Sequence, residues 1–219
     1  MTEEVELQAA EGSVSPELQA EFPGLRLDWV TAPAHDGGSP PAVKRRLGEL
    51  SNRYRGASVV AMRTQPIPRA YRTFFRHIGL DPDTTRIPSE EAAVARLLQG
   101  AFVPISLIAD ALLIALIETG VPVWALDADL VDQGGLGIRT TAAGDRLGTG
   151  EHAATLEPGR LVVADARTIH AQLFGELAPG HGIGPRTARA ALFAVSVDGV
   201  PRIHAEEALW VCVEVLGAG

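Results

Sequence analysis

The sequence predicts a mixed α/β fold, and three observations support this prediction. Hydrophobic residues make up 46% of the 219 residues and the mean hydropathy is +0.12, as expected for a folded globule and not for a disordered chain. Apolar residues recur at helical spacing chiefly in the first half, whereas short strand-like runs lie chiefly in the second half. The length suits one sizeable core, so we expect a flexible acidic tail over 1–15 and a single domain over 16–219.

The first expected elements are a short helix and a strand. Ser15 suits the N-cap position and Pro16 the first helical position, so a helix is expected to begin there. The run LRLDWV alternates as a half-buried strand does, and the Gly-, Pro- and Ser-rich residues 32–41 predict a loop. A helix is expected next over 42–55.

The segment PIPRAYRTFFRHIGL predicts an amphipathic helix that ends at Gly79, before Pro82. One side carries apolar residues at helical spacing: Ala70, Phe74, Phe75 and Ile78. The other side carries three arginines: Arg69, Arg72 and Arg76.

Two further helices are expected in the middle of the chain. Ser89 is a suitable N-cap for the first, where Glu90 and Glu91 favour the positive end of the helix dipole. Its expected buried stripe is Ala93, Val94, Leu97 and Leu98. The second, over 104–118, is apolar nearly all round, which predicts a central position.

Strands dominate the rest of the chain. Glycine-rich turns separate four strand-like runs, at 121–127, 135–141, 160–166 and 189–197. The final segment, 204–216, could form a closing helix or, because it is rich in valine, a strand.

Several classes of protein are disfavoured. No apolar run reaches the length that spans a bilayer, so we expect no membrane partner. The acidic start of the chain lacks the regions of a signal peptide, and the single Cys212 excludes an intramolecular disulfide and a thiolate metal cluster. A reducing cytoplasm is the expected location.

The charge distribution is uneven. A net charge of −8 argues against nucleic-acid binding in general, and we expect no DNA partner. However, residues 44–96 contain 11 basic and 5 acidic residues, which could give an acidic protein a locally positive face. The alternative is that arginine is simply frequent, since Lys44 is the only lysine.

No generic catalytic motif is present, but some residues are candidates for chemistry. The glycine-rich residues 180–187 could present backbone N–H groups to an anion or could be a plain mobile loop. The six histidines show no metal-ligand spacing, so we expect neither a metal nor another cofactor. His170 and His181 lie in a loop-rich region, where functional side chains tend to be displayed.

Three carboxylates also need an explanation. Asp110 interrupts an apolar helix, and a buried carboxylate requires a donor, for which Arg86 and Arg96 are the candidates. The result could be a purely structural ion pair. Asp127 and Asp129, at a strand end, could be turn residues or pocket residues.

Taken together, the motifs resemble the B3/B4 domain of the bacterial phenylalanyl-tRNA synthetase beta subunit. The matching segments are YRTFFRHIGLDPDTTRIPSEEAAVARLLQG, ADALLIALIETGVPVWALDAD, GLGIRTTAAGDRL and GRLVVADA, in order within residues 16–200. Their motif residues are Tyr71, Arg72, Asp81, Pro82, Arg86, Pro88, Ser89, Glu90, Arg96, Gly100, Asp110, Pro122, Asp127, Gly135, Arg139, Gly144, Asp145 and Asp165. The resemblance implies a three-layer B3/B4-type fold with a mixed sheet flanked by helices. It also implies kinship with a domain that, within the synthetase, hydrolyses wrongly charged Tyr-tRNA(Phe), and with free-standing proteins of similar length.

This sequence also departs from the family. Leu113 and Leu116 stand where an asparagine and a serine are usual, and Asp145 replaces a glutamate. The segment 166–187 replaces a part that is often rich in tryptophan and arginine. These differences put hydrolysis of Tyr-tRNA(Phe) itself in doubt.

Three functions are therefore open. The first is a trans-editing deacylase of mischarged aminoacyl-tRNA, which is not itself a complete ligase. The second is a non-catalytic tRNA- or RNA-binding module, and the third is a binder or hydrolase of amino-acid-like small molecules without an RNA role. The oligomeric state is open.

For the deacylase we assign three sets of residues. The catalytic candidates are Asp145, His170 and His181, with Asp145 or Asp127 holding the substrate ammonium and a histidine near the water. The substrate-binding candidates are Arg86, Asp110, Asp127, Arg139 and Thr187. The tRNA backbone would meet Arg69, Arg72 and Arg76.

Overall fold

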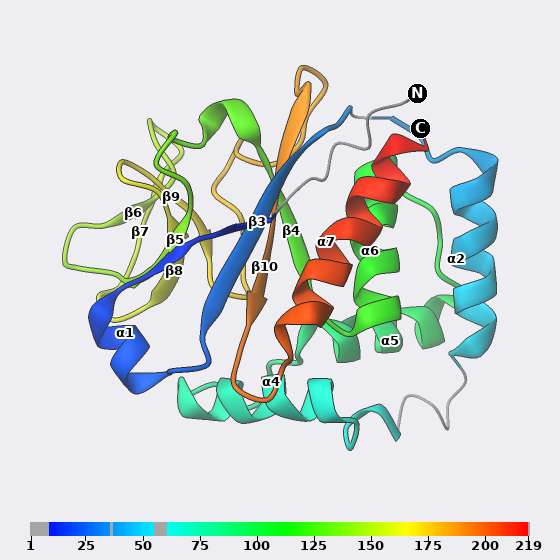
Figure 1. The fold of residues 1–219 in the computed structure, drawn as a ribbon, viewed down its shortest axis with the longest axis horizontal. Helices are drawn as coiled ribbons and strands as arrows, with labels where there is room; N and C mark the ends of the chain where they lie inside the picture. Colours follow the sequence, from blue (N-terminus) through cyan, green and yellow to red (C-terminus); the bar gives the residue numbers. More distant parts are fainter. Residues whose placement is uncertain (1–8, 36, 55–60, 219) are drawn as a thin grey trace.

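Two β-sheets lie side by side, and helices cover the free face of one of them (Figure 1). The computed structural model describes residues 9–35, 37–54 and 61–218. The helices are α1 (Pro16–Glu21), α2 (Pro41–Arg53), α4 (Pro66–His77), α5 (Pro88–Gln99), α6 (Leu107–Thr119), the short 3₁₀ helix η1 (Ala128–Leu130) and α7 (Arg202–Gly217). The strands are β1 (Ala10–Glu11), β2 (Ser13–Val14), β3 (Arg26–Pro33), β4 (Val123–Asp127), β5 (Gly137–Thr140), β6 (Arg146–Leu147), β7 (Ala154–Thr155), β8 (Leu161–Ala164), β9 (Ile169–Gln172) and β10 (Arg189–Ser196).

The four-stranded sheet is antiparallel, in the order β1-β3-β10-β4. Its strand β10 is buried at every residue except the first, because α7 packs on one face and the second sheet lies beyond the other (Figure 1). The six-stranded sheet has the order β2-β5-β8-β9-β6-β7 and is mixed, with parallel pairs β2–β5 and β6–β9. The mixed α/β fold class is confirmed, with the strands divided between two sheets.

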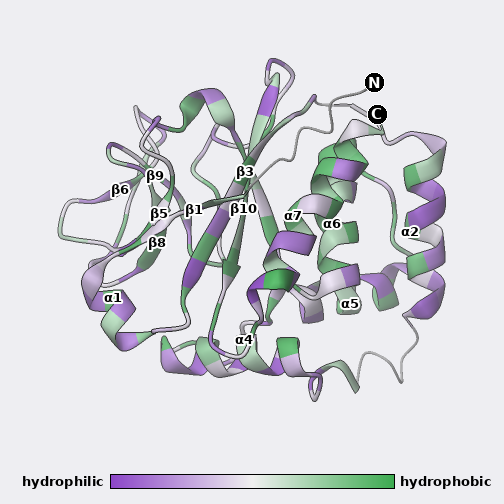
Figure 2. Cartoon of the chain, in the orientation of Figure 1, coloured by the Kyte–Doolittle hydropathy of each residue, from purple (hydrophilic) through white to green (hydrophobic). Residues whose placement is uncertain are grey.

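The helical side has a central and an outer part. Helix α6 is mostly apolar in Figure 2 and packs against α7, while α2 shows both colours and packs against α6 from outside. The central position predicted for the apolar helix is confirmed. The closing segment is a helix, α7, because its buried residues, such as Leu209, Cys212 and Leu216, recur at helical spacing against the sheet.

Some local expectations were wrong. Residues 10–14 are not a flexible tail, because they pair with β3 and β5, whereas residues 1–8 lie outside the described residues. Helix α5 begins at Pro88 with Ile87 as its N-cap, since the residue before proline favours an extended backbone. In the expected stripe of this helix, Leu97 and Leu98 are 42% and 83% exposed.

The short strands β6, β7 and β9 were not expected. Two of them have only two residues, which is too short to show a period. Strand β9 lies inside the segment 166–187 that departs from the family, and it includes the buried His170.

Candidate active site

Three side chains from separate segments form a continuous hydrogen-bonded chain. Asp165 follows β8, His170 belongs to β9, and His181 lies in the loop before β10. His170 Nε2 is 2.8 Å from Asp165 Oδ2, and His170 Nδ1 is 2.8 Å from His181 Nδ1. His170 is fully buried and His181 is 6% exposed, so the contacts form away from bulk water.

The backbone holds Asp165 in its ionised form. Its Oδ1 accepts the N–H groups of Arg167 and Thr168, and its Oδ2 accepts the N–H of Asp132 as well as His170. Burial alone would raise the pKa of Asp165, but these hydrogen bonds outweigh burial and lower the pKa to about 2. The carboxylate is therefore only an acceptor near neutral pH.

This acceptor determines the protonation of both rings. His170 must carry its proton on Nε2 in order to donate to Asp165. In neutral His170 the Nδ1 is then an acceptor, so the proton between the rings belongs to His181 Nδ1. The Nε2 of His181 is left as an unprotonated base.

That base reaches solvent. His181 Nε2 has no hydrogen-bond partner among the described residues, and it is not among their buried unpartnered atoms. Gly148 lies beside it, since a Cβ on Gly148 would stand 3.7 Å from Nε2. Burial lowers the pKa of His181 and His170 lowers it further, while Asp165 raises it, so the ring is neutral at pH 7. When His181 Nε2 takes up a proton, the ring can release its Nδ1 proton to His170 Nδ1. The positive charge then lies on His170, beside the Asp165 carboxylate.

A second hydrogen-bonded unit joins this chain through the backbone. The N–H of Asp127 donates to the carbonyl of His181 at 2.8 Å. The Asp127 carboxylate accepts the Thr187 hydroxyl at 2.7 Å, and that hydroxyl accepts the N–H of Gly184. Asp127 also accepts the N–H of Asp129, so it is both a turn residue and a neighbour of the histidines. Four of the candidates, Asp127, His170, His181 and Thr187, are thus brought together.

Asp145 and Arg139 form a separate pair. The Arg139 guanidinium donates to Asp145 Oδ2 at 2.6 Å, and the same oxygen accepts the N–H of Ala142. The Arg139 hydrogen bond, followed by the Ala142 N–H, lowers the pKa of Asp145. This pair holds the turn between β5 and β6, and no hydrogen bond joins its side chains to the two histidine rings among the described residues. Arg139 also borders a cavity of about 400 Å³ whose wall includes Asp165.

Asp110 and Arg86 lie apart from each other and from the histidine chain. The buried Asp110 accepts the Ser39 hydroxyl at 2.5 Å and the N–H of Ile105 at 3.0 Å. The expected pairing of Asp110 with Arg86 or Arg96 is therefore wrong, because a serine and a backbone amide supply the donors. Arg96 donates to the carbonyl of Ser51, and Arg86 is exposed with no partner among the described residues.

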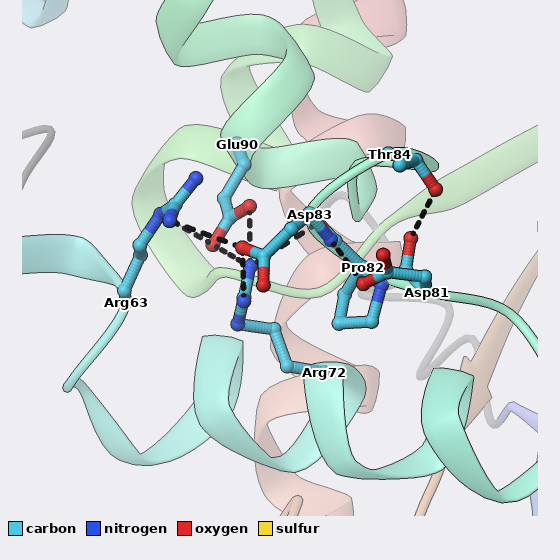
Figure 3. Close-up of polar contacts among 7 residues, drawn as sticks. All are labelled: Arg63, Arg72, Asp81, Pro82, Asp83, Thr84 and Glu90. Atoms are coloured by element: carbon cyan, nitrogen blue, oxygen red, sulfur yellow. Dashed lines mark hydrogen bonds and ion pairs between the residues drawn. The ribbon is translucent and has the colours of Figure 1, made fainter.

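Arg72 does not share the exposed face expected for it. It is 7% exposed, donates to both oxygens of the buried Glu90 at 2.9 Å, and reaches Asp83 at 2.7 Å (Figure 3). These contacts bind α4 to α5 and to the turn that begins at Asp81. Arg69 and Arg76 are exposed as expected.

One known protein family matches part of the chain. Residues 70–177 match the family described as the B3/4 domain. The chain carries a B3/4 domain. None of the curated proteins compared with the chain matches it. The resemblance drawn from the motifs is thereby confirmed.

The B3/4 match includes Asp165 and His170 but ends before His181 and Thr187. The last ring of the hydrogen-bonded chain is thus supplied from beyond the matched residues. Sequence reasoning placed Asp165 in the family motif but did not select it as a site residue. The sequence feature that could have identified Asp165 is an aspartate at a strand end, followed by a polar turn and, five residues on, a histidine.

The described residues contain neither a cluster suited to a metal ion nor a helix suited to spanning a membrane. Among the described residues, no group of three or more His, Cys, Asp or Glu side chains could hold a metal ion. None of the helices in the described ranges is long and apolar enough to cross a membrane.

Proposed function

We propose that this B3/4 domain protein hydrolyses the ester of mischarged aminoacyl-tRNA in trans, with His181 as the general base. The observation that carries the proposal is the Asp165–His170–His181 chain, which ends in an unprotonated nitrogen that solvent reaches. The kinship of the B3/4 domain with a tRNA synthetase directs the choice of substrate class.

The reaction needs few groups because an aminoacyl ester is already activated. A water oxygen attacks the ester carbonyl carbon while His181 Nε2 takes a proton from that water. The same proton then passes to the ribose oxygen as the ester bond breaks, which releases the amino acid and the tRNA. Asp127, held by Thr187, is the carboxylate proposed for the substrate ammonium.

Binding of the tRNA backbone is assigned to Arg69 and Arg76. Both are exposed on α4, and Phe174 connects that helix to the segment after His170 by packing against Tyr71, Phe74 and Phe75. The same two arginines favour the second candidate function, a tRNA-binding module without catalysis.

The deciding experiment is single-turnover deacylation of a panel of mischarged tRNAs at low salt. We expect hydrolysis of at least one pair, and a loss of about 10²–10⁴-fold in His181→Ala, the usual contribution of a general base. His77→Ala, which removes an exposed histidine at the end of α4, is the matched control and should retain the rate. Salt-sensitive tRNA retention without hydrolysis would instead establish the binding module.

A further inference from the structure

Phe174 has a backbone conformation that is unfavourable for a residue with a side chain. Its φ is 58°, and no other non-glycine residue in the described ranges has a positive φ. The left-handed region crowds the Cβ of an L-residue, so turns that need it normally place glycine or asparagine there. A glycine does stand in this turn, but one residue later, at Gly175. A large aromatic residue at such a position is expected only where the surrounding packing holds it there.

The strained residue lies at the tip of a hairpin on which both histidines depend. The N–H of Gly175 donates to the carbonyl of Gln172 at 3.0 Å and closes the turn. On the arms, the N–H of Ala178 donates to the carbonyl of His170 at 2.7 Å. The N–H of His181 then donates to the carbonyl of Ala178 at 3.0 Å. The backbone positions of both histidines therefore follow from the shape of this hairpin.

The ring of Phe174 attaches the hairpin to two other elements. Three of its aromatic neighbours belong to α4, with ring centroids 5.4–5.8 Å from its own: Tyr71, Phe74 and Phe75. The fourth is Trp124 on β4, at 5.6 Å. Aromatic rings at these distances and tilted angles attract one another beyond the burial of their surface. The ring thus has a packing reason to remain at the strained position.

Strand β4 also holds the second histidine. Three residues after Trp124, the N–H of Asp127 donates to the carbonyl of His181 at 2.8 Å. Trp124 is itself stacked on Phe193 of β10, with ring centroids 5.5 Å apart, so it is fixed to the four-stranded sheet. The ring of Phe174 therefore packs on the strand that holds His181, while its backbone forms the hairpin turn.

We propose that Phe174 is a positioning residue that keeps the rings of His170 and His181 in hydrogen-bond contact. The two Nδ1 atoms are 2.8 Å apart, and a shift of about 1 Å between the hairpin and β4 would break this bond. Without the bond, the proton of His181 is no longer held on Nδ1, and the neutral ring exchanges between its two tautomers. The role rests on the proposed use of His181 as the general base, but the hydrogen bond can be observed without the reaction.

The test is nitrogen NMR of the histidine rings in the full chain, at about pH 8 and without tRNA. In the wild-type protein we expect His181 to carry its proton on Nδ1 and His170 on Nε2. Phe174→Gly relieves the backbone but removes the ring, so the two nitrogens of His181 should give averaged signals. The titration of His181 should also move up towards the ordinary pKa of 6.5, because burial is the main cause of its lowered pKa. Single-turnover deacylation should fall by about 10–10²-fold, as a misplaced catalytic group predicts.

Two further variants separate the ring from general packing. Phe174→Leu keeps an apolar side chain, provides a second reading if the glycine variant does not fold, and should also average the His181 signals. Its matched control is Phe22→Leu, because Phe22 packs its ring on Phe74 of the same helix at 5.2 Å, from the end of α1. The control should leave the histidine signals unchanged, and Phe174→Tyr, which retains the ring, should give wild-type signals.

Wild-type histidine signals in the folded Phe174→Gly and Phe174→Leu proteins would overturn the proposal. Equal changes in Phe22→Leu would also overturn it, because they would show a general effect of packing on α4. Altered His181 signals in the two Phe174 variants, with no hydrolysis by the wild-type protein, would support the positioning role and reject the ester hydrolysis alone.

Discussion

Asp165 is the residue on which the candidate site depends, although it touches no substrate in the proposed reaction. It accepts three backbone N–H groups and one ring nitrogen, so the His170 Nε2 that faces it must carry a proton. With one proton on His170, its Nδ1 accepts the Nδ1 proton of His181, and His181 Nε2 is then the unprotonated base. Asp165 and His170 are thus positioning residues, and His181 is the one that would meet the water.

Replacing Asp165 with asparagine should reverse this direction. The amide can donate to His170 Nε2, which would place the proton on His170 Nδ1 and leave His181 Nε2 protonated. We expect the deacylation rate of Asp165→Asn to fall about 10²–10⁴-fold with little change in KM. Asp145→Asn is the control, since Asp145 serves the Arg139 pair and should keep a rate close to wild type. Equal losses in the two variants would contradict the assignment.

The pH dependence of deacylation should follow His181. Its pKa lies below the ordinary value of 6.5, because burial disfavours the charged ring, so less than half of the base is protonated at pH 6.5 and the rest is lost as the pH falls further. We expect the acidic limb of the pH–rate profile below pH 6.5, after the uncatalysed hydrolysis has been subtracted. A limb centred above pH 7 would show that another group is the base.

At the scale of elements, the junction of α4 and α5 rests on a buried ion pair. Arg72 and Glu90 are 7% and 3% exposed. One guanidinium nitrogen of Arg72 donates to both Glu90 oxygens, and another donates to Asp83 (Figure 3). Exposed arginines on the same helix, such as Arg76, have no comparable environment. Arginine thus has a structural role at position 72 and is exposed to solvent at position 76, one helical turn later.

Arg72→Met should lower the free energy of unfolding by about 3–5 kcal/mol, because it removes the guanidinium that donates to both oxygens of the buried Glu90 and leaves that carboxylate with Arg63 Nε, 3.6 Å away, as its cationic neighbour. Arg76→Met, a matched change on the exposed side of α4, should alter it by less than about 0.5 kcal/mol. Urea unfolding followed by circular dichroism measures both. The double variant Arg72→Met/Glu90→Leu should recover part of the loss, and a double variant no more stable than Arg72→Met would contradict this explanation.

The whole molecule combines an acidic total charge with a locally basic helix surface. The net charge is −8, so association with tRNA must rely on the few cations that are not engaged internally. Arg46, Arg72 and Arg202 are engaged in ion pairs, whereas Arg69 and Arg76 are exposed on α4. Because Arg69 and Arg76 are seven residues apart on one helix and so share a face, we expect a phosphate backbone to bind there.

The double variant Arg69→Ala/Arg76→Ala should weaken tRNA binding and reduce the slope of log K against log salt by about 2. Arg160→Ala, which removes an exposed arginine before β8, is the control and should leave the slope unchanged. Filter binding between 50 and 200 mM salt would supply the slopes. Identical slopes for wild type and double variant would place the interface elsewhere.

The sequence by itself determined the fold class and most element positions. Prolines at the first turns of α1, α4 and α5 and left-handed glycines such as Gly79 and Gly120 act through the local backbone, so their effect can be read without the rest of the chain. The apolar period placed α6 at the centre for the same reason. Family motifs added the B3/4 domain, because their residue types and their order along the chain can be read without the folded structure.

Only the tertiary structure decided the site. His170 and His181 are 11 residues apart and Asp127 and Thr187 are 60 apart, and no local rule specifies that these side chains meet. The donors of Asp110 and the burial of Arg72 were likewise decided by packing, because a charged group takes whichever partner the fold brings within reach. Local propensity fixes where an element begins and ends, whereas the chemistry of a site depends on long-range contacts that form only when the elements pack.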